Sequence, residues 1–329
     1  MTDQKSNVEF GVFWGPEIRQ KLGKKEVLIE QLLYAGDVIC ISADPGVGKS
    51  ILALQLMFNL TTGTPFLGTF DIPKVCNVLY VQSEGDRSET VERIEAMEGG
   101  LKIDDERWAH INIAGITLNT VEGFENFKKL SSLPGIEYDV IIIDPLYTTV
   151  KGSLKEDNVA TDWIRNVRTI KELYKECAMI VLHHDTKETF QDGKAVPRRA
   201  DNVFGSVFWG AYLSYNYKLT KHNNVHTLTL GKRRTSKSLD KIEMRLMEPF
   251  PLMYVYADED ASIAKRQVEK VIIDNREGIT AKGIIEKTEL SKATVFRVLK
   301  ILKEGGLINK VEHKFAPLYI SAKISTKAT

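Results

Sequence analysis

One stretch of eight residues combines the residue types that hold phosphate groups. It reads Ala43-Asp44-Pro45-Gly46-Val47-Gly48-Lys49-Ser50. A short apolar run at residues 38–41 precedes it and has the composition of a buried parallel strand. Residues 51–57 follow it and are rich in good helix formers. A strand, a glycine-containing loop, a Lys-Ser pair and a helix in this order predict a P-loop.

The predicted loop has a defined chemistry. Its backbone N–H groups and the N-terminal end of the next helix would surround phosphate oxygens. Lys49 would reach the β- and γ-phosphates, and the Ser50 hydroxyl would bind Mg²⁺. We therefore expect ATP and Mg²⁺ as cofactors, held by residues 43–50 and by Ile51. The alternative is a glycine turn between two core elements. Ala43 stands at the first position of the motif in place of glycine, which costs nothing only if its φ is negative.

Two carboxylates have the placement that hydrolysis of the γ-phosphate requires. Asp144 follows the apolar residues 140–143, and this Walker B pattern places a carboxylate where it can hold the Mg²⁺ hydration shell. The residue directly after Asp144 is not acidic, so a carboxylate from elsewhere in the chain must orient the attacking water. Glu84, at the end of the predicted strand 77–82, is the best candidate. The competing interpretations are a strand-capping Asp ahead of Pro145 and a solvated loop carboxylate at position 84.

Two histidines, His183 and His184, end another apolar run at residues 179–182. A hydrogen bond from this pair could sense the γ-phosphate, and we take His183 as the catalytic candidate. Adjacent residues of a strand point to opposite faces, so we do not expect the pair to bind a metal. For the same reason, one of the two is expected to be a packed or capped histidine.

Lys232 and Arg234 lie two residues apart on an extended basic segment, so they point to the same side. They could reach the γ-phosphate bound by a neighbouring subunit, with Arg234 as an arginine finger and Lys232 as a nucleotide contact. The alternative is a basic turn in solvent.

Strands and helices alternate along this part of the chain, which predicts an α/β fold with a mostly parallel sheet. Strands are expected at 38–41, 77–82, 140–143 and 179–182, with a weaker one at 111–113. Ligands bind beyond the carboxyl ends of such strands, which is where the P-loop and the polar groups above lie. Further extended runs at 212–219, 225–230, 242–247 and 252–257 favour antiparallel additions at the sheet edge. Residues 186–206 lie between the strand at 179–182 and the run at 212–219. This polar segment, which includes Arg198 and Arg199, predicts a long loop that would face DNA.

The charge of the chain is uneven. The 329 residues have a net charge of +1, but residues 261–329 carry 14 lysines and arginines against 7 acidic residues. A basic C-terminal part indicates a polyanionic partner, with a solvated basic face as the alternative. Three scattered cysteines fit a reducing cytoplasm. We see no signal peptide and no apolar run of about 18 residues, so we expect a cytoplasmic protein without membrane spans.

Three helices and two strands are predicted after residue 260, in the order of a winged helix-turn-helix domain. Ser291 has the character of an N-cap for the third helix. Basic and hydroxyl side chains off its apolar stripe, and others on the β-ribbon, are candidate DNA contacts; these are Lys292, Thr294, Arg297, Lys300, Lys310 and Lys314. Winged helices also bind proteins, which is the alternative. We expect an N-terminal arm at 1–25, an ATPase domain at 26–257 and a winged-helix domain at 258–329.

The motifs together resemble a known family. Thr64-Pro65-Phe66-Leu67-Gly68, the run 78–81 leading to Glu84, Asp144-Pro145-Leu146 and His183-His184 resemble the RecA-like ATPases of plasmid and phage replication, with the RepA hexameric helicase, a relative of the DnaB motor, as the nearest type. The resemblance covers roughly residues 26–257. It implies a RecA-like core, a ring of six subunits with ATP between them, Glu84 as catalytic base and Asp144 as the Mg²⁺ residue.

The resemblance also indicates which residue would act as the arginine finger. Lys232-Arg233-Arg234 is similar to the Lys-x-Arg finger of the DnaB type. RepA-like proteins instead place an arginine before a Gly-Ser pair, where this chain has Phe204-Gly205-Ser206, and that difference favours Arg234.

The resulting expectation is an ATP- and Mg²⁺-dependent helicase acting on single-stranded DNA in the replication of a mobile element. Two alternatives stay open. One is a helicase loader or recombination mediator that hydrolyses ATP without unwinding. The other is a DNA-binding regulator that uses ATP as an assembly switch.

Overall fold

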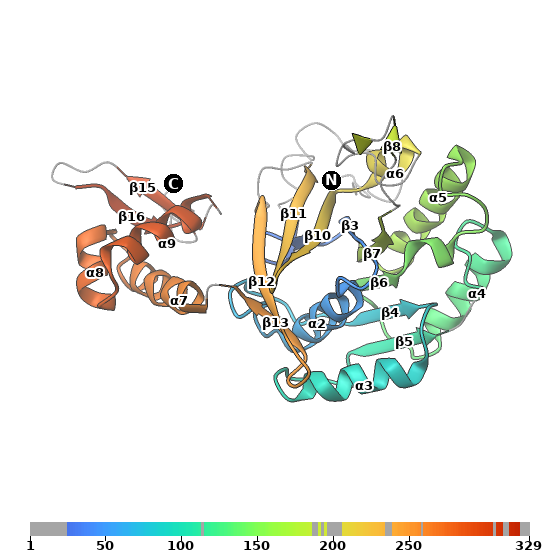
Figure 1. Ribbon diagram of the computed structural model, residues 1–329, viewed down its shortest axis with the longest axis horizontal. Coiled ribbons are helices and arrows are strands. Elements are labelled where there is room, and N and C mark those ends of the chain that lie inside the picture. The colour runs from blue at the N-terminus through green and yellow to red at the C-terminus, as the bar shows by residue number, and fades with distance from the viewer. Residues whose placement is uncertain are drawn as a thin grey trace, which may run out of the picture.

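The computed structural model describes residues 25–112, 115–185, 190–191, 194–195, 206–233, 239–257, 259–304, 307–311 and 316–322. Of the expected N-terminal arm, only Lys25 belongs to the described residues. A central sheet with helices on both faces forms the larger part of the described chain, and a small helical part lies beside it (Figure 1).

The central sheet has nine strands in the order β13-β12-β11-β10-β3-β7-β6-β4-β5 within the described residues. The six strands from β10 to β5 run parallel to one another, and β11, β12 and β13 continue the sheet in antiparallel order. The strands are β3 (Val38–Ala43), β4 (Val78–Gln82), β5 (Trp108–Asn112), β6 (Val140–Asp144), β7 (Ala178–His184), β10 (Tyr215–His222), β11 (Val225–Arg233), β12 (Lys241–Met247) and β13 (Met253–Tyr256).

Each face of this sheet has its own hydrophobic core, because side chains alternate along each strand. On β3, Ile39 and Ile41 join the core built with α2, whereas Val38 and Cys40 join the core built with α4 and α5. The helices are α2 (Lys49–Thr62), α3 (Arg87–Glu98), α4 (Val121–Ser132), α5 (Asp157–Leu173), α6 (Val207–Tyr212) and the 3₁₀ turn η2 (Leu146–Thr149). This arrangement is the RecA-like α/β fold with a mostly parallel sheet, so the predicted fold class is confirmed.

Several local predictions differ from the structure. Tyr212, expected to start a strand, ends helix α6. Strand β10 pairs in parallel with β3, so only β11 to β13 are antiparallel additions. Strand β5 begins at Trp108 instead of residue 111, because its half-exposed edge position lacks the continuous apolar run of an inner strand.

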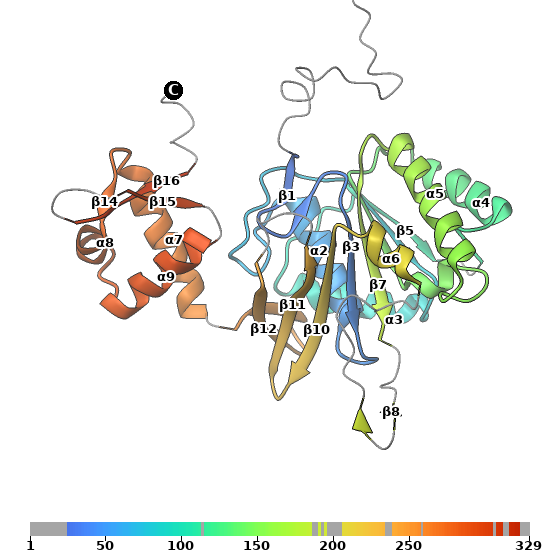
Figure 2. The same cartoon turned by 90° about the horizontal axis from the view of Figure 1, so that it is seen from above.

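Two small hairpins flank the sheet. Strands β1 (Val27–Ile29) and β2 (Leu33–Tyr34) form one, and β8 (Phe190–Gln191) and β9 (Lys194–Ala195) form the other. The second hairpin lies within the long loop predicted at 186–206. In Figure 2, β8 lies beyond the end of β7, away from the helices α4 and α5.

The C-terminal elements surround a third hydrophobic core. They are α7 (Glu259–Asp274), β14 (Ile279–Thr280), α8 (Ala281–Thr288), α9 (Lys292–Glu304), β15 (Ile308–Val311) and β16 (Leu318–Ser321). The Ser291 side chain accepts a hydrogen bond from the Thr294 N–H at 3.1 Å, which confirms the predicted cap of α9. The Lys265 ammonium of α7 donates to the Thr69 carbonyl at 3.1 Å and so joins this part to the larger one. The winged-helix assignment and the domain boundaries stay predictions.

None of the helices in the described ranges is both long enough and apolar enough to cross a membrane.

Candidate nucleotide-binding site

The predicted phosphate loop follows the carboxyl end of the central strand β3 and leads directly into α2. Gly48 is the N-cap of α2 with a φ of 97°, and Gly46 has a φ of 77°. Only glycine adopts such angles without strain, which explains both glycines of the motif. Ala43 is the last residue of β3 and its φ is not positive, so the departure from glycine at this position costs nothing.

The Lys49 side chain turns back into the loop. Its ammonium donates to the carbonyl oxygens of Ala43 at 2.8 Å and Asp44 at 3.0 Å, and it lies 3.3 Å from Nδ1 of His184. Burial lowers the pKa of Lys49, and nearby carboxylates, Asp144 first among them, oppose this effect. A cation in a partly dehydrated loop can bind an anion strongly, because little water has to be displaced from it.

Asp144 is the last residue of strand β6. Strand β6 pairs with β7, and β7 pairs with β3, the strand that leads into the P-loop. The residue is 6% exposed, and its Oδ2 accepts a hydrogen bond from the hydroxyl of Tyr80 at 2.6 Å. Tyr80 comes from β4, the strand beside β6, and its side chain is fully buried. One carboxylate oxygen is therefore fixed by the protein.

Glu84 and His184 meet at the same end of the sheet. Oε2 of Glu84 lies 3.6 Å from Nε2 of His184, and both side chains are partly exposed. Since the other ring nitrogen of His184 faces Lys49, this histidine lies between the predicted base and the phosphate-binding lysine. His183, the residue nominated from the sequence, is 3% exposed inside the sheet. Because side chains alternate along a strand, the two rings lie on opposite faces of the sheet, as predicted from the sequence. Only the structure shows which ring faces the loop.

The residues at this edge have the right donors for ATP and Mg²⁺. The Ser50 hydroxyl and the Asp144 carboxylate are oxygen ligands, and Mg²⁺ takes one or two such protein ligands together with phosphates and water. Gly46 has open space where a Cβ would stand, so a ligand can approach its backbone. Among the described residues no cluster of three or more His, Cys, Asp or Glu side chains could hold a metal ion.

The finger candidates lie mostly outside the described residues. Arg234, Arg198 and Arg199 are among the residues that the structure does not describe. Lys232 is described by its backbone alone and pairs with Asn216, which in turn pairs with Cys40 of β3. The strand thus runs toward the amino end of β3, whereas the P-loop follows its carboxyl end. The described end of this strand, up to Arg233, therefore lies at the end of the sheet opposite to the P-loop.

Five of the predicted DNA contacts lie on α9 and β15. Lys292, Lys300 and Lys310 are exposed. The Thr294 hydroxyl lies 2.9 Å from that of Ser291 and so takes part in the helix cap. The side chain of Arg297 and all of Lys314 lie outside the described part of the structure.

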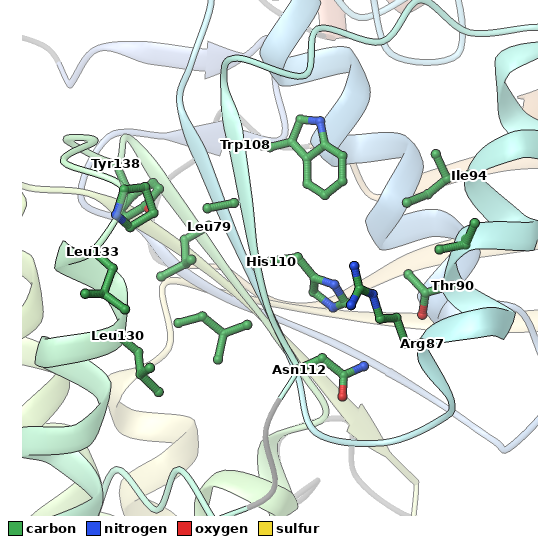
Figure 3. Close-up of a pocket in the computed structure, with 14 residues that line it drawn as sticks. Leu79, Arg87, Thr90, Ile94, Trp108, His110, Asn112, Leu130, Leu133 and Tyr138 are labelled. Atoms are coloured by element: carbon green, nitrogen blue, oxygen red, sulfur yellow. The ribbon is translucent and has the colours of Figure 1, made fainter.

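A cavity of about 650 Å³ lies elsewhere, along the outer strand β5 between α3 and α4 (Figure 3). It is lined by Leu79, Arg87, Thr90, Val91, Ile94, Trp108, Ala109, His110, Ile111, Asn112, Leu130, Leu133, Pro134 and Tyr138. His110 in this cavity lies 3.2 Å from the buried Gln82 amide oxygen, and Tyr80 stacks on its ring at 5.5 Å. The cavity thus adjoins the residues that support Asp144 but does not include the P-loop.

Sequence reasoning missed three residues of the site. Tyr80 lies inside an apolar run, where it has the appearance of a core residue. Tyr254 and His226 contact the P-loop from strands more than 170 residues further along the chain. No local pattern marks them, because only the folding of the antiparallel strands over α2 brings them to the loop.

Comparisons with known proteins agree with this geometry. The sequence profile of the AAA domain family matches residues 10–189, more than half of the chain. Among solved structures, an isolated ATPase domain is similar with a TM-score of 0.51 and 13% identity, covering 78% of this chain and 100% of that one. A DnaB-like replicative helicase studied with primase has a TM-score of 0.51 and 12% identity, covering 77% and 68%. No curated protein matches by sequence. At these identities the structural likeness establishes the RecA-like fold.

Proposed function

This chain belongs to the AAA domain family, and we propose that it is a Mg²⁺-dependent ATPase that acts as a motor on single-stranded DNA, of the RepA and DnaB-like type. The observation that carries the proposal is the meeting of Lys49, Asp144 and the Glu84–His184 pair beside one P-loop. A phosphate cradle, a metal carboxylate and a second carboxylate in one place are what γ-phosphate hydrolysis requires.

Each residue has a proposed task. The loop N–H groups and Lys49 bind the phosphates, and Ser50 and Asp144 hold Mg²⁺, which supplies charge neutralisation at the γ-phosphate. Glu84 orients the attacking water. His184, between Glu84 and Lys49, is placed to respond to an occupied γ-phosphate site, and it takes over this part of the role assigned to His183 from the sequence.

The assembly is part of the proposal. Arg234 would act as the arginine finger at a neighbour's nucleotide, which requires a closed ring, of six subunits in the resemblance, or a filament. We propose residues 26–257 as the ATPase domain and 258–329 as a winged-helix domain whose basic α9 and ribbon contact duplex DNA. The likeness of the core to a DnaB-like replicative helicase supports the choice of a helicase over other ATPases.

Hydrolysis of ATP should be measured with and without single-stranded DNA on one preparation whose oligomeric state is determined. Strong stimulation by DNA in a ring-sized species supports the motor, and unwinding of a forked duplex would then be tested. Turnover without strand separation would favour the helicase loader or recombination mediator. Site-specific duplex binding with negligible turnover would favour the regulator.

A further inference from the structure

Tyr254 of β13 contacts the backbone of the P-loop through its hydroxyl. Its hydroxyl donates to the carbonyl oxygens of Val47 at 3.2 Å and Gly48 at 3.3 Å. The side chain is fully buried, and its ring packs edge-on against His226 with centroids 5.1 Å apart. The Tyr254 side chain thus binds the backbone of the phosphate loop, and His226 of β11 packs against its ring.

The position of Tyr254 is itself fixed. The Gln55 amide of α2 donates to the Tyr254 carbonyl at 2.8 Å and accepts from the Tyr254 N–H at 2.6 Å. This pair of hydrogen bonds is buried and satisfies both ends of the Gln55 amide. Strand β13 and the P-loop helix therefore form one rigid unit, and the hydroxyl has little freedom to leave the loop.

The geometry of the peptide bond gives these contacts a consequence. In a trans peptide the C=O and N–H groups point in opposite directions. A Val47 carbonyl turned toward Tyr254 therefore directs the Gly48 N–H away from Tyr254. The Gly48 carbonyl, which also accepts a hydrogen bond from the Leu52 N–H at 3.0 Å, places the Lys49 N–H in the same way. These are the N–H groups that a P-loop offers to phosphate.

We propose that Tyr254 is a positioning residue of the nucleotide site, which holds the Val47–Gly48–Lys49 peptide planes so that their N–H groups face the phosphates. The inference rests on the proposed function, since it assumes that this loop binds a nucleotide. It gives strand β13, which lies far from the P-loop motif in the sequence, a part in phosphate binding.

Two further observations agree with it. Burial raises the pKa of Tyr254 far above its ordinary value, so the hydroxyl keeps its proton and remains a donor at every physiological pH. A Cβ added at Gly48 would overlap the Tyr254 hydroxyl. Glycine at this position is thus required by the contact as well as by its positive φ.

The test compares Tyr254→Phe with wild type in the affinity for fluorescently labelled ADP and ATP in the presence of Mg²⁺. Loss of the hydroxyl should weaken both nucleotides by the same factor, about 3- to 10-fold, because the loop N–H groups serve the phosphates that both nucleotides carry. Tyr174→Phe is the matched control. It removes a buried tyrosine hydrogen bond, from Tyr174 to the Ser131 hydroxyl at 2.7 Å, in the core on the other face of the sheet.

The outcomes separate the two claims. Thermal unfolding of both variants without nucleotide shows the loss of stability that any buried hydrogen bond brings, and it verifies that each variant folds. Weaker binding in Tyr254→Phe and unchanged binding in Tyr174→Phe support the inference. Equal binding in Tyr254→Phe and wild type would overturn it while leaving the ATPase proposal intact. If wild-type protein binds neither nucleotide, the proposed function fails and this inference fails with it.

Discussion

The hydroxyl of Tyr80 donates a hydrogen bond to Oδ2 of Asp144 at 2.6 Å, between neighbouring strands of the sheet. Burial, and then the Asp144 charge, raise the pKa of Tyr80 far above its usual value, so the tyrosine is a permanent donor. The bond engages one carboxylate oxygen, and the proposed contact with Mg²⁺ would use the other. The orientation of this carboxylate is thus set by a residue from another strand.

Tyr80→Phe should therefore raise the Mg²⁺ concentration needed for half-maximal ATP hydrolysis and lower kcat by about 10-fold. A hydrogen bond to a charged group is worth about 1.5–3 kcal/mol, and its loss frees the carboxylate to rotate. Titration of ATPase activity with Mg²⁺ measures both effects. An unchanged Mg²⁺ requirement would show that Asp144 does not depend on this bond.

Lys49→Ala should abolish nucleotide binding or reduce turnover at least about 100-fold, because it removes the cation placed for the β- and γ-phosphates. Nucleotide affinity and steady-state hydrolysis are the measurements. Near-normal hydrolysis in this variant would remove the basis for the P-loop assignment.

Glu84→Gln should keep nucleotide binding and lose most of the hydrolysis, since the amide cannot act as a base toward water. Glu89→Gln is its control, because Glu89 lies in α3 and pairs with Arg93 on the surface at 3.6 Å. Single-turnover hydrolysis distinguishes the two variants. Similar rates in both would mean that another group orients the water.

Arg234→Ala should bind ATP normally and hydrolyse it poorly. A finger that acts between subunits also predicts complementation. Mixed with Lys49→Ala subunits, the Arg234→Ala subunits gain neighbours with an intact finger, so part of the activity should return. Full activity of Arg234→Ala alone would direct attention to residues 198–206. Poor activity that mixing does not restore would argue against a role between subunits.

The buried His226 predicts a pH dependence of stability. Burial, and then Lys221, lower the pKa of His226 below its ordinary 6.5. The unfolded chain then takes up the proton more readily than the folded one, so the stability present above pH 6.5 declines as the pH falls through 6.5 toward the folded-state pKa. Urea unfolding of wild type and His226→Phe between pH 7.5 and 5 tests this. The difference in unfolding free energy should be largest at the upper end and decrease on acidification; a constant difference would contradict the prediction.

The sequence predicted the parallel core well, because buried strands such as β3, β6 and β7 are continuous apolar runs that end in chemically informative residues. The P-loop, Asp144 and Glu84 could be predicted because they come directly after such strands. The direction of β10 could not be predicted, because side chains alternate with a period of two residues in parallel and antiparallel strands alike. The contributions of Tyr80, His184 and Tyr254 depend on which face a side chain occupies and on pairing between distant strands, and neither is encoded in a local pattern.

The place of β3 in the sheet also governs when the nucleotide site can form during synthesis. Its two neighbours are β7, at residues 178–184, and β10, at residues 215–222. The strand that leads into the P-loop must therefore wait for more than 130 residues of later chain before either partner exists. At roughly 5–20 residues per second, this is on the order of ten seconds on the ribosome. Until then the backbone N–H and C=O groups on both edges of β3 have no strand partner, so the P-loop motif is translated early but its supporting sheet forms late.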